Sequence, residues 1–311
     1  MSDQVAMRAA FGEALLEMAP HHPKLVVLDA DVSHSTQTVH FGKKYPGRFF
    51  NAGAAEANMV DMAGGMATCG LHPVASTFAI FMTLKATDQI RNNLCYNNLP
   101  VILVGGYAGL SDSFDGASHQ SVIDLVIMRA MPNMKVMVPA DAVEMKQALS
   151  IALKEPGPVY IRSSRNPSPV LFNNEPEMEL GKIRKIGEGK DITIAVCGIP
   201  TYMAMEAADQ LEKEGVSVDL LNVSTLKPMD EETLIRSVTK TGRILTVEEH
   251  SIIGGLGGAV AETLVQSYPV PVANIGIRDV FSDTGPYHEL LAKYGISTSA
   301  IVERSKILLN A

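Results

Sequence analysis

Short apolar runs alternate along the chain with segments whose apolar residues recur at three- and four-residue spacing. Residues 25–28, 101–104 and 192–197 are near-continuous apolar runs, which is typical of strands buried on both faces. Residues 5–18 and 141–153 have the helical period. This alternation predicts an α/β protein with open, mostly parallel sheets covered by helices on both faces.

The same pattern extends over the rest of the chain. Further strands are expected at residues 72–77, 135–138, 159–162, 216–223, 243–247 and 272–277. Further helices are expected at residues 56–67, 84–96, 118–131, 202–214, 231–238 and 257–266.

The alternation breaks once, between residues 163 and 190. This stretch is rich in Pro, Asn and acidic residues, as linkers and crossing segments are. The chain is therefore predicted to form two open-sheet domains, at residues 1–165 and 191–311, joined by a linker at 166–190. The second domain is the smaller one.

Composition narrows the class of protein. The net charge is −8 and there is no basic run, which argues against nucleic acid as a partner. The three cysteines, Cys69, Cys95 and Cys197, have no metal-ligand spacing and are expected to be buried thiols. No signal peptide and no run of eighteen apolar residues is visible, so we expect a cytoplasmic protein without a membrane span.

A lone carboxylate, Glu56, opens the predicted helix 56–67, which is built mostly of Ala, Gly, Met and Val. Burial penalises its charge, whereas a helix N-terminus favours the anion. A carboxylate held between these two forces is a candidate for proton exchange with a bound ligand. Its alternative role is a structural charge that stabilises the helix start.

Two further segments follow predicted strand ends, where open α/β sheets bind ligands. Phe78 and Phe81 stand three residues apart in a chain that is poor in aromatic residues, and they either stack on a flat heterocycle or pack as ordinary core rings. The loop 111–120 brings Asp115 and His119 together, and His119 suits acid–base work or hydroxyl binding. The alternative is a helix capped by Ser118 beside an exposed histidine.

The glycine run 254–258 has the composition of an anion-binding loop. It lacks both the Lys-Ser/Thr of a Walker loop and the GxGxxG spacing. We therefore expect a tight connection that lets the following helix pack closely.

Together these segments resemble the C-terminal portion of transketolase, in the form where that enzyme is split into two chains. The resemblance rests on residues 53–59 (Gly-Ala-Ala-Glu-Ala-Asn-Met), 77–81 (Thr-Phe-Ala-Ile-Phe) and 115–120 (Asp-Gly-Ala-Ser-His-Gln), in the family's order. Residues 132–134 with 139–141 add to it, and residues 226–230 and 247–250 resemble the family's C-terminal domain. It covers essentially the whole chain. It implies a pyrimidine-binding domain of the thiamine-diphosphate fold, followed by a transketolase C-terminal-like domain.

The resemblance implies thiamine diphosphate as the cofactor and transfer of a two-carbon ketol unit from a ketose to an aldose phosphate as the reaction. Glu56 would hydrogen-bond the ring nitrogen of the aminopyrimidine, a contact that favours the imino tautomer. Phe78 and Phe81 would stack on the pyrimidine. Asp31 and Leu84 would lie near the cofactor, with Leu84 replacing a third aromatic residue.

The resemblance also assigns a substrate pocket. Asp115 and His119 would contact substrate hydroxyls, with His119 as a second catalytic residue. Arg8, Ser35 and Arg165 would line the pocket for the far anionic group of a sugar phosphate or sugar sulfonate.

Two positions depart from the family's pattern. The glutamine that usually follows the glutamate is Ala57, and a histidine that contacts substrate in relatives is Tyr107. These departures leave the cofactor chemistry better supported than the identity of the substrate's tail.

In the family, a Gly-Asp-Gly motif and a later Asn hold the diphosphate and Mg²⁺, and this chain contains no Gly-Asp-Gly. The resemblance therefore implies that this chain has no metal ligand and that an N-terminal transketolase subunit carries the diphosphate and Mg²⁺ site. It implies a two-plus-two assembly that includes a second copy of this chain. The setting would be carbohydrate metabolism, with the pentose phosphate pathway as the usual place.

Three alternatives remain. Beta subunits of 2-oxoacid dehydrogenases share the architecture, but residues 115–120 and 77–81 fit transketolase better. Relatives of deoxyxylulose phosphate synthase carry their diphosphate module on the same chain. A non-catalytic partner protein has no reason to keep a semi-buried Glu56, because an unpaired buried charge costs several kcal/mol.

Overall fold

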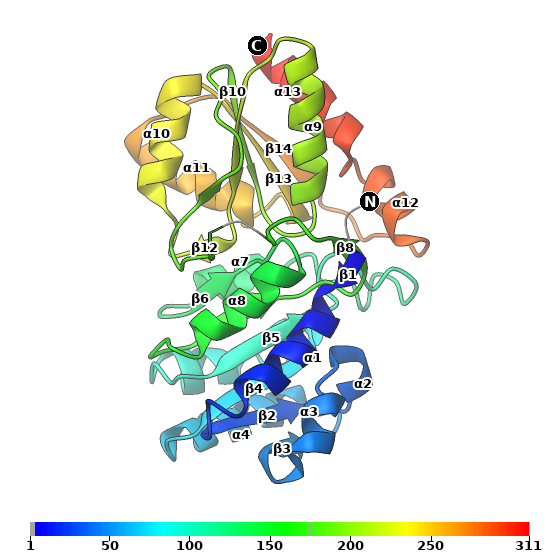
Figure 1. Cartoon of the computed structure of the whole chain (residues 1–311), viewed down its shortest axis with the longest axis vertical. Coiled ribbons are helices and arrows are strands. Elements are labelled where there is room, and N and C mark those ends of the chain that lie inside the picture. The colour runs from blue at the N-terminus through cyan, green and yellow to red at the C-terminus, as the bar shows by residue number, and fades with distance from the viewer. Residues whose placement is uncertain (1–3, 174–175, 311) are drawn as a thin grey trace.

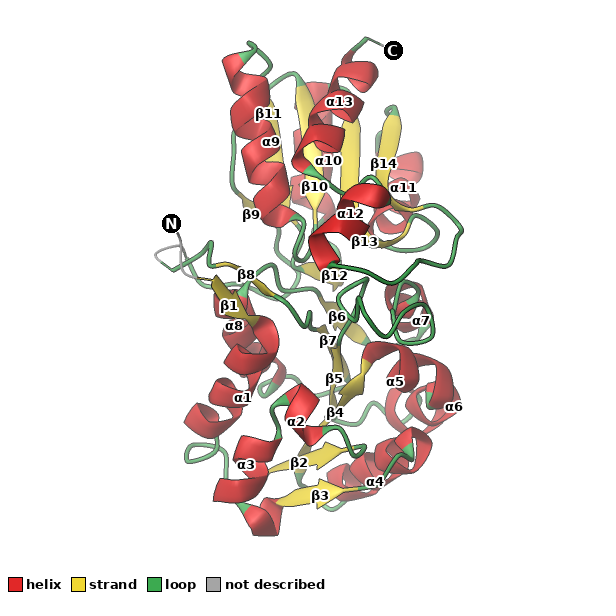
Figure 2. Ribbon diagram, turned by 90° about the vertical axis from the view of Figure 1, so that its right-hand side faces the viewer, coloured by secondary structure: helices red, strands yellow, loops and turns green. Residues whose placement is uncertain are grey.

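The computed structural model describes residues 4–173 and 176–310 (Figures 1 and 2). Two α/β units are stacked along the long axis, with the N-terminal half of the chain in the lower unit of Figure 1 and most of the C-terminal half in the upper one. Both sheets are built mainly of parallel strands with helices on their faces, so the predicted fold class is confirmed.

The lower unit contains a seven-stranded sheet in the order β12-β6-β7-β5-β4-β2-β3. All neighbours are parallel except β12, which comes from the second half of the sequence and pairs antiparallel with β6. The strands are β2 (Leu25–Asp29), β3 (Phe49–Asn51), β4 (His72–Phe78), β5 (Ile102–Gly106), β6 (Lys135–Met137), β7 (Val159–Arg162) and β12 (Thr225–Lys227).

Helices cover both faces of this sheet because both faces of its central strands are apolar. On one face Val27 and Val74 share a core with α1 (Met7–Met18) and α8 (Ala142–Ala152). On the other, Leu28 and Ala75 pack in a core that includes α4 (Glu56–Thr68), α5 (Ala79–Lys85) and α7 (Asp124–Ala130). Figure 2 shows the first pair to the left of the sheet and the second group to its right. The remaining short elements are α2 (Ser33–Thr36), α3 (Val39–Lys44), η1 (Pro46–Arg48), α6 (Thr87–Gln89) and the π-helical turn η2 (Ile90–Cys95).

The upper unit contains a five-stranded sheet in the order β14-β13-β10-β11-β9, with only β9 antiparallel. Its strands are β9 (Arg184–Lys185), β10 (Ile192–Val196), β11 (Val218–Asn222), β13 (Ile244–Ser251) and β14 (Val272–Ile277). Its helices are α9 (Thr201–Lys213), α10 (Glu231–Thr241), α11 (Leu256–Ser267), α12 (Tyr287–Lys293) and α13 (Thr298–Leu309).

The described parts of the segment 166–190 contain two short strands, which a plain linker would lack. Its β8 (Pro167–Pro169) pairs antiparallel with β1 (Gln4–Ala6), and its β9 joins the upper sheet. Asn174 and Glu175 lie outside the described residues. The domain boundaries at 165 and 191 stay predictions.

Three local expectations were wrong. The helix expected at 118–131 begins only at Asp124, because Ser121 forms β-bridges with Ala108 and Gly109 instead of a helical turn. The helix expected at 84–96 begins earlier, as α5, and continues after a break as α6 and η2. Cys69, expected to be buried, is exposed because it caps the surface end of α4, whereas Cys95 and Cys197 are buried.

The junction between the two units is organised around Arg162, at the end of β7. Its guanidinium donates to both carboxylate oxygens of Asp124, at 2.8 and 3.3 Å, and to the backbone carbonyls of Ser121 and Glu249, at 3.1 and 2.8 Å. Tyr160 also donates to Asp124. Burial alone would raise the pKa of Asp124, but the adjacent Arg162 lowers it below its usual value. The Asp124–Arg162 pair therefore stays ionised although it is buried.

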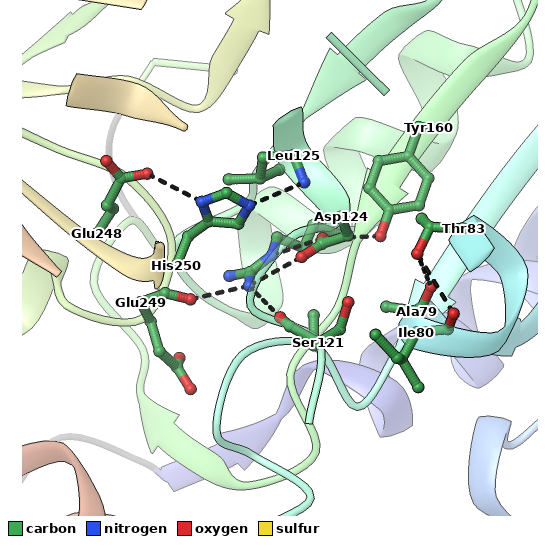
Figure 3. A network of polar contacts seen from close by, with 12 residues as sticks. Ala79, Ile80, Thr83, Ser121, Asp124, Leu125, Tyr160, Glu248, Glu249 and His250 are labelled. Carbon is green, nitrogen blue, oxygen red and sulfur yellow. Dashed lines mark hydrogen bonds and ion pairs between the residues drawn. The ribbon is translucent and has the colours of Figure 1, made fainter. Parts of the chain in front are cut away.

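The motif at residues 248–250 lies near the end of β13, and its Glu249 and His250 contact the lower unit (Figure 3). The backbone N–H of Leu125 donates to Nε2 of His250, so this ring is neutral and carries its proton on Nδ1, which contacts the Ser251 carbonyl at 2.7 Å. Burial lowers the pKa of His250 to about 4. The histidine therefore acts as a neutral hydrogen-bonding bridge between the two units.

The glycine run at 254–258 binds the chain's own carboxylate. Glu248 accepts hydrogen bonds from the amides of Leu256 and Gly257 at the start of α11, at 2.7 and 2.8 Å. A Cβ on Gly255 would stand 1.9 Å from a carboxylate oxygen of Glu248, so only glycine fits there. The close packing expected from the sequence is present, and the anion site at the helix start is filled internally.

Glu249 bonds to both units, to Leu110 in the lower one and to Tyr287 in the upper one. Its carboxylate accepts from the amide of Leu110 at 2.6 Å and from the hydroxyl of Tyr287 at 2.8 Å. Gly109 has a φ of 66°, and its missing side chain leaves the room that Glu249 occupies. Burial raises the pKa of Glu249 to about 7.

Within residues 4–173 and 176–310, no helix is both long and apolar enough to cross a bilayer.

The raised pKa of Glu249 predicts a pH-dependent effect on stability. Between about pH 4.5 and 7 the folded chain keeps a proton that the unfolded chain releases, so wild-type stability falls as pH rises through this window. Glu249→Gln cannot ionise. Its free energy of unfolding, relative to wild type, should rise by up to about 3 kcal/mol between pH 4.5 and 8 in denaturant titrations. The exposed Glu303→Gln, at a carboxylate outside the ion pairs of the described residues, is the control and should show a much smaller difference. A flat difference for Glu249→Gln would contradict the prediction.

Candidate active site

The predicted site residues gather at one edge of the lower sheet, where parallel strands β2, β4, β5 and β7 end. Asp31, Phe78, Tyr107 and Arg165 lie at or just beyond these four strand ends. Because the carboxyl ends of parallel strands meet at the same edge, residues distant in sequence become neighbours.

Glu56 is the first residue of α4 and its side chain is only 5% exposed. Its carboxylate pairs with the ammonium of Lys85, at the end of α5, at 2.9 Å. The Lys85 side chain is itself 50% exposed. The buried Glu56 carboxylate is therefore paired with a lysine that reaches it from the solvent side, and a ligand could displace this lysine.

Lys85 also lies against the ring of Phe81, with its ammonium 4.0 Å from the ring centroid. The same cation thus contacts two of the three groups that were assigned to the pyrimidine, Glu56 and Phe81. Sequence reasoning missed Lys85, although its spacing offered a signal: it follows Phe81 by four residues on one helix, so both side chains lie on the same face.

The aromatic residues form one continuous array. The ring of Phe78 stacks on Tyr107 with centroids 4.3 Å apart and on Phe81 at 5.7 Å. His119 meets both phenylalanines edge-on, at 6.2 and 5.1 Å. Residues from β4, α5, the loop after β5 and the loop 111–120 are therefore brought into contact.

Two arginines flank Tyr107. Arg8 donates to the tyrosine hydroxyl at 3.0 Å, and the guanidinium of Arg165 lies 5.0 Å from the ring centroid. Arg8 also contacts Ser35, but it does so at the backbone carbonyl, 3.3 Å away, and not at the hydroxyl. Tyr107 has a φ of 58°, which is rare for an aromatic residue and marks stored backbone strain. Such strain is typical of functional sites.

Asp112 is a buried neighbour that the sequence did not single out. It accepts from Arg165 at 2.9 Å. Burial, together with the nearby Asp115, raises the pKa of Asp112 to about 7, although Arg165 opposes the shift. Arg165 is therefore held between an aromatic ring and a carboxyl that titrates near neutral pH.

Asp31 and Leu84 lie at the rim. Asp31 has a φ of 65° and exchanges hydrogen bonds with the side chain of Asn51, which also accepts from the amide of Gly53. This link ties the end of β2 to the turn that leads into Glu56. Leu84 is 54% exposed. Among the described residues no group of three His, Cys, Asp or Glu side chains is arranged to hold a metal ion.

Comparison with known proteins agrees with this arrangement. Residues 3–169 match the pyrimidine binding domain of transketolase, and residues 181–301 match the transketolase C-terminal domain. The chain is 42% identical to a putative transketolase C-terminal section from Methanocaldococcus jannaschii, over 96% of this chain and 94% of that protein. It is 38% identical to a 6-deoxy-6-sulfo-D-fructose transketolase subunit from Clostridium sp. (strain MSTE9), over 95% of this chain and 92% of that protein.

A solved structure described as a split gene transketolase, inactive beta4 tetramer, superposes with a TM-score of 0.91 at 44% identity and covers 99% of both chains. The two matched domains define a pyrimidine-binding domain joined to a transketolase C-terminal domain. The chain belongs to the transketolase family, whose members depend on thiamine diphosphate.

The Glu56–Lys85 pair predicts a measurable coupling. Lys85→Met should lower the free energy of unfolding of the chain by about 1–3 kcal/mol, because it leaves a buried carboxylate without its cation while the half-exposed lysine limits the loss. Adding Glu56→Gln should recover most of this loss. Lys306→Met, which breaks an exposed ion pair with Glu214, is the control and should cost less than about 1 kcal/mol. Additive effects of the two site substitutions would show that the pair is not coupled.

Proposed function

We propose that this chain is the C-terminal subunit of a thiamine-diphosphate-dependent transketolase. It would transfer a two-carbon ketol unit from a ketose to an aldose phosphate. The observation that carries the proposal is the buried carboxylate of Glu56, linked through Lys85 to the stacked rings of Phe81 and Phe78, in a chain of the transketolase family.

The residues fit the aminopyrimidine end of the cofactor. Glu56 and Phe81 would hold the aminopyrimidine, and Lys85 now contacts both of these residues. Lys85 has half its side chain in solvent and can move aside without being buried elsewhere. When bound, thiamine diphosphate supplies a carbon nucleophile that takes up the ketol unit.

In this proposal Glu56 would hydrogen-bond the ring nitrogen of the bound aminopyrimidine and would help hold a proton there. Its low exposure strengthens that contact, since a hydrogen bond to a charged group counts for more where water is excluded. His119 stands edge-on to both rings and would exchange a proton with a substrate hydroxyl, while Asp115 would orient the sugar.

Arg8, Arg165, Ser35 and Tyr107 would receive the far end of the sugar. Two guanidinium groups suit a tetrahedral oxyanion, either phosphate or sulfonate. Tyr107 is a neutral hydroxyl that already accepts from Arg8. A neutral wall penalises a dianion more than a monoanion, which keeps a sulfonated sugar within the proposed substrate class. A relative named as a sulfofructose transketolase subunit supports this choice.

The diphosphate and Mg²⁺ would be held by a separate N-terminal subunit, because this chain has no Gly-Asp-Gly. The names of relatives of matching length, a C-terminal section and a split-gene chain, support that division. We infer a two-plus-two assembly, acting in cytoplasmic carbohydrate metabolism such as the pentose phosphate pathway. Leu84 and Asp31 would complete the cofactor's surroundings at the rim.

The test of the proposed function compares this chain alone with the pair formed by this chain and its co-purified N-terminal subunit. The pair should transfer ketol units between a panel of ketoses and aldose phosphates, whereas the chain alone should be inactive and bind thiamine diphosphate with Mg²⁺ poorly in calorimetric titration. Most of the cofactor's charge and its metal lie outside the part that this chain recognises. Micromolar binding and turnover by the chain alone would overturn the division into subunits.

The variant Glu56→Gln, assembled with the N-terminal subunit, tests the role of Glu56 in the site. It should remain folded and lose at least about a hundredfold in rate, since one preorganised electrostatic contact is worth roughly 3 kcal/mol. Proton exchange at the reactive carbon of the cofactor, followed by NMR, should slow by a similar factor. An unchanged exchange rate would remove Glu56 from this role while leaving the assembly result intact.

The pocket around Tyr107 predicts the choice of tail. Wild-type enzyme should favour a phosphate over a matched sulfonate ketose by well under a hundredfold in kcat/KM, and Tyr107→His should shift the ratio toward phosphate by adding a group that can carry positive charge. Tyr107→Phe, which removes the hydroxyl without adding charge, is the matched control. A wild-type preference of a hundredfold, about 2.7 kcal/mol, would end the sulfonate assignment.

A further inference from the structure

The loop 108–125 carries Asp115 and His119, yet the other domain provides much of its support. At its start, the amide of Leu110 donates to the Glu249 carboxylate at 2.6 Å. At its end, the amide of Ser251 donates to the Val122 carbonyl at 2.8 Å, and Leu125 donates to His250 at 3.2 Å. Figure 3 shows Glu249 and His250 facing Ser121 and Leu125 across this junction. Both ends of the loop are therefore fixed by the strand β13 of the upper unit.

The middle of the loop is fixed by a second segment of the upper unit, residues 282–285. The buried side chain of Gln120 donates to the carbonyl of Asp283 at 3.1 Å and accepts from the hydroxyl of Ser282. The amide of Gly285 donates to the carbonyl of Ser113 at 3.0 Å. Gly116, with a φ of 79°, packs so closely that a Cβ would meet the methyl group of Thr284 at 2.8 Å.

The parts of the loop that face the site contrast with these anchors. Asp115 is exposed and His119 is half-buried, and each lies between an anchored residue before it and another after it. Gln120 directly follows His119, so its two bonds to the upper unit fix the backbone from which the histidine ring reaches Phe78 and Phe81. Loops without such support pay an ordering entropy each time they bind a ligand.

We propose that the C-terminal domain holds the loop 108–125 in the conformation that binds substrate. Gln120 is the principal positioning residue and Ser282 is its partner. The domain then contributes to substrate recognition although none of its residues was assigned to the site. Ordering the loop in advance removes an entropic cost from substrate binding, so its effect falls on KM and not on cofactor affinity. This inference rests on the proposed function, because it takes Asp115 and His119 as the residues that meet the substrate.

The test uses the assembled pair and the variants Gln120→Met, which keeps the length of the side chain but makes neither bond, and Ser282→Ala, a milder change. Thr298→Ala is the matched control, since it removes a side-chain hydrogen bond to Glu206 within the same domain and away from the loop. Three quantities are measured for each: amide hydrogen exchange over residues 110–121, KM and kcat for a ketose donor, and the dissociation constant of thiamine diphosphate.

For Gln120→Met we expect faster exchange in the loop, a KM raised by about five- to thirtyfold, and a cofactor dissociation constant within about twofold of wild type. Ser282→Ala should move the same quantities less, and Thr298→Ala should leave them unchanged. An unchanged rate of amide hydrogen exchange in the loop of Gln120→Met would overturn the proposal that the C-terminal domain holds this loop in place. Faster exchange with an unchanged KM would instead overturn the assignment of this loop to the substrate, while ketol transfer by the wild-type pair would still stand as the separate test of the proposed function.

Discussion

The buried guanidinium of Arg162 is the constraint on which the arrangement of this molecule depends. A buried cation is tolerated only when it is paired and its donors are satisfied. Arg162 meets this condition with groups from three places: the carboxylate of Asp124 at the start of α7, the carbonyl of Ser121, and the carbonyl of Glu249 in the upper unit. The end of β7, the beginning of α7 and the strand β13 must therefore meet at one point.

The contacts around Arg162 position part of the candidate site. The rings of Phe78 and Tyr107 rest on rigid strand ends, whereas Asp115 and His119 are carried by a loop that leaves the sheet and returns at the Arg162 junction. One half of the site is thus fixed by the parallel sheet itself, and the other half by contacts between the two units. The Glu56–Lys85 pair belongs to the first half, because both partners sit on helices that pack against the same face of the sheet.

Much of the fold and part of the site could be predicted from the sequence. Apolar runs located the central strands, because parallel strands are buried on both faces and leave an unbroken signal. Glu56 and the pair Phe78 and Phe81 were found because a lone charge and rare rings stand out from their surroundings. The helix start at Ser118 was wrong because the backbone of Ser121 is taken up by β-bridges to Ala108 and Gly109, a long-range competition that local spacing does not contain.

Other features were hidden for the same kind of reason. Lys85 has the look of an ordinary surface lysine until the fold brings Glu56 to it across 29 positions of sequence. The pairing of Arg162 with Asp124 spans 38 positions. The strand β12 lies in the second half of the chain but completes the first sheet. Sequence patterns report which surfaces are apolar, and they say little about which charged groups will become neighbours.

The left-handed backbone at Tyr107 limits how this site can diverge over evolutionary time. At a φ of 58° a β-branched side chain is strongly strained, whereas Gly, Asn, Asp and His are the residues that adopt this conformation most readily. The substitutions that this backbone favours therefore all remove the phenol ring, and Asn, Asp and His replace it with a different polar or charged group. Each of these replacements would also change the group that lies between Arg8 and Arg165. The backbone conformation at Tyr107 thus restricts which amino acids can vary the chemistry between these two arginines.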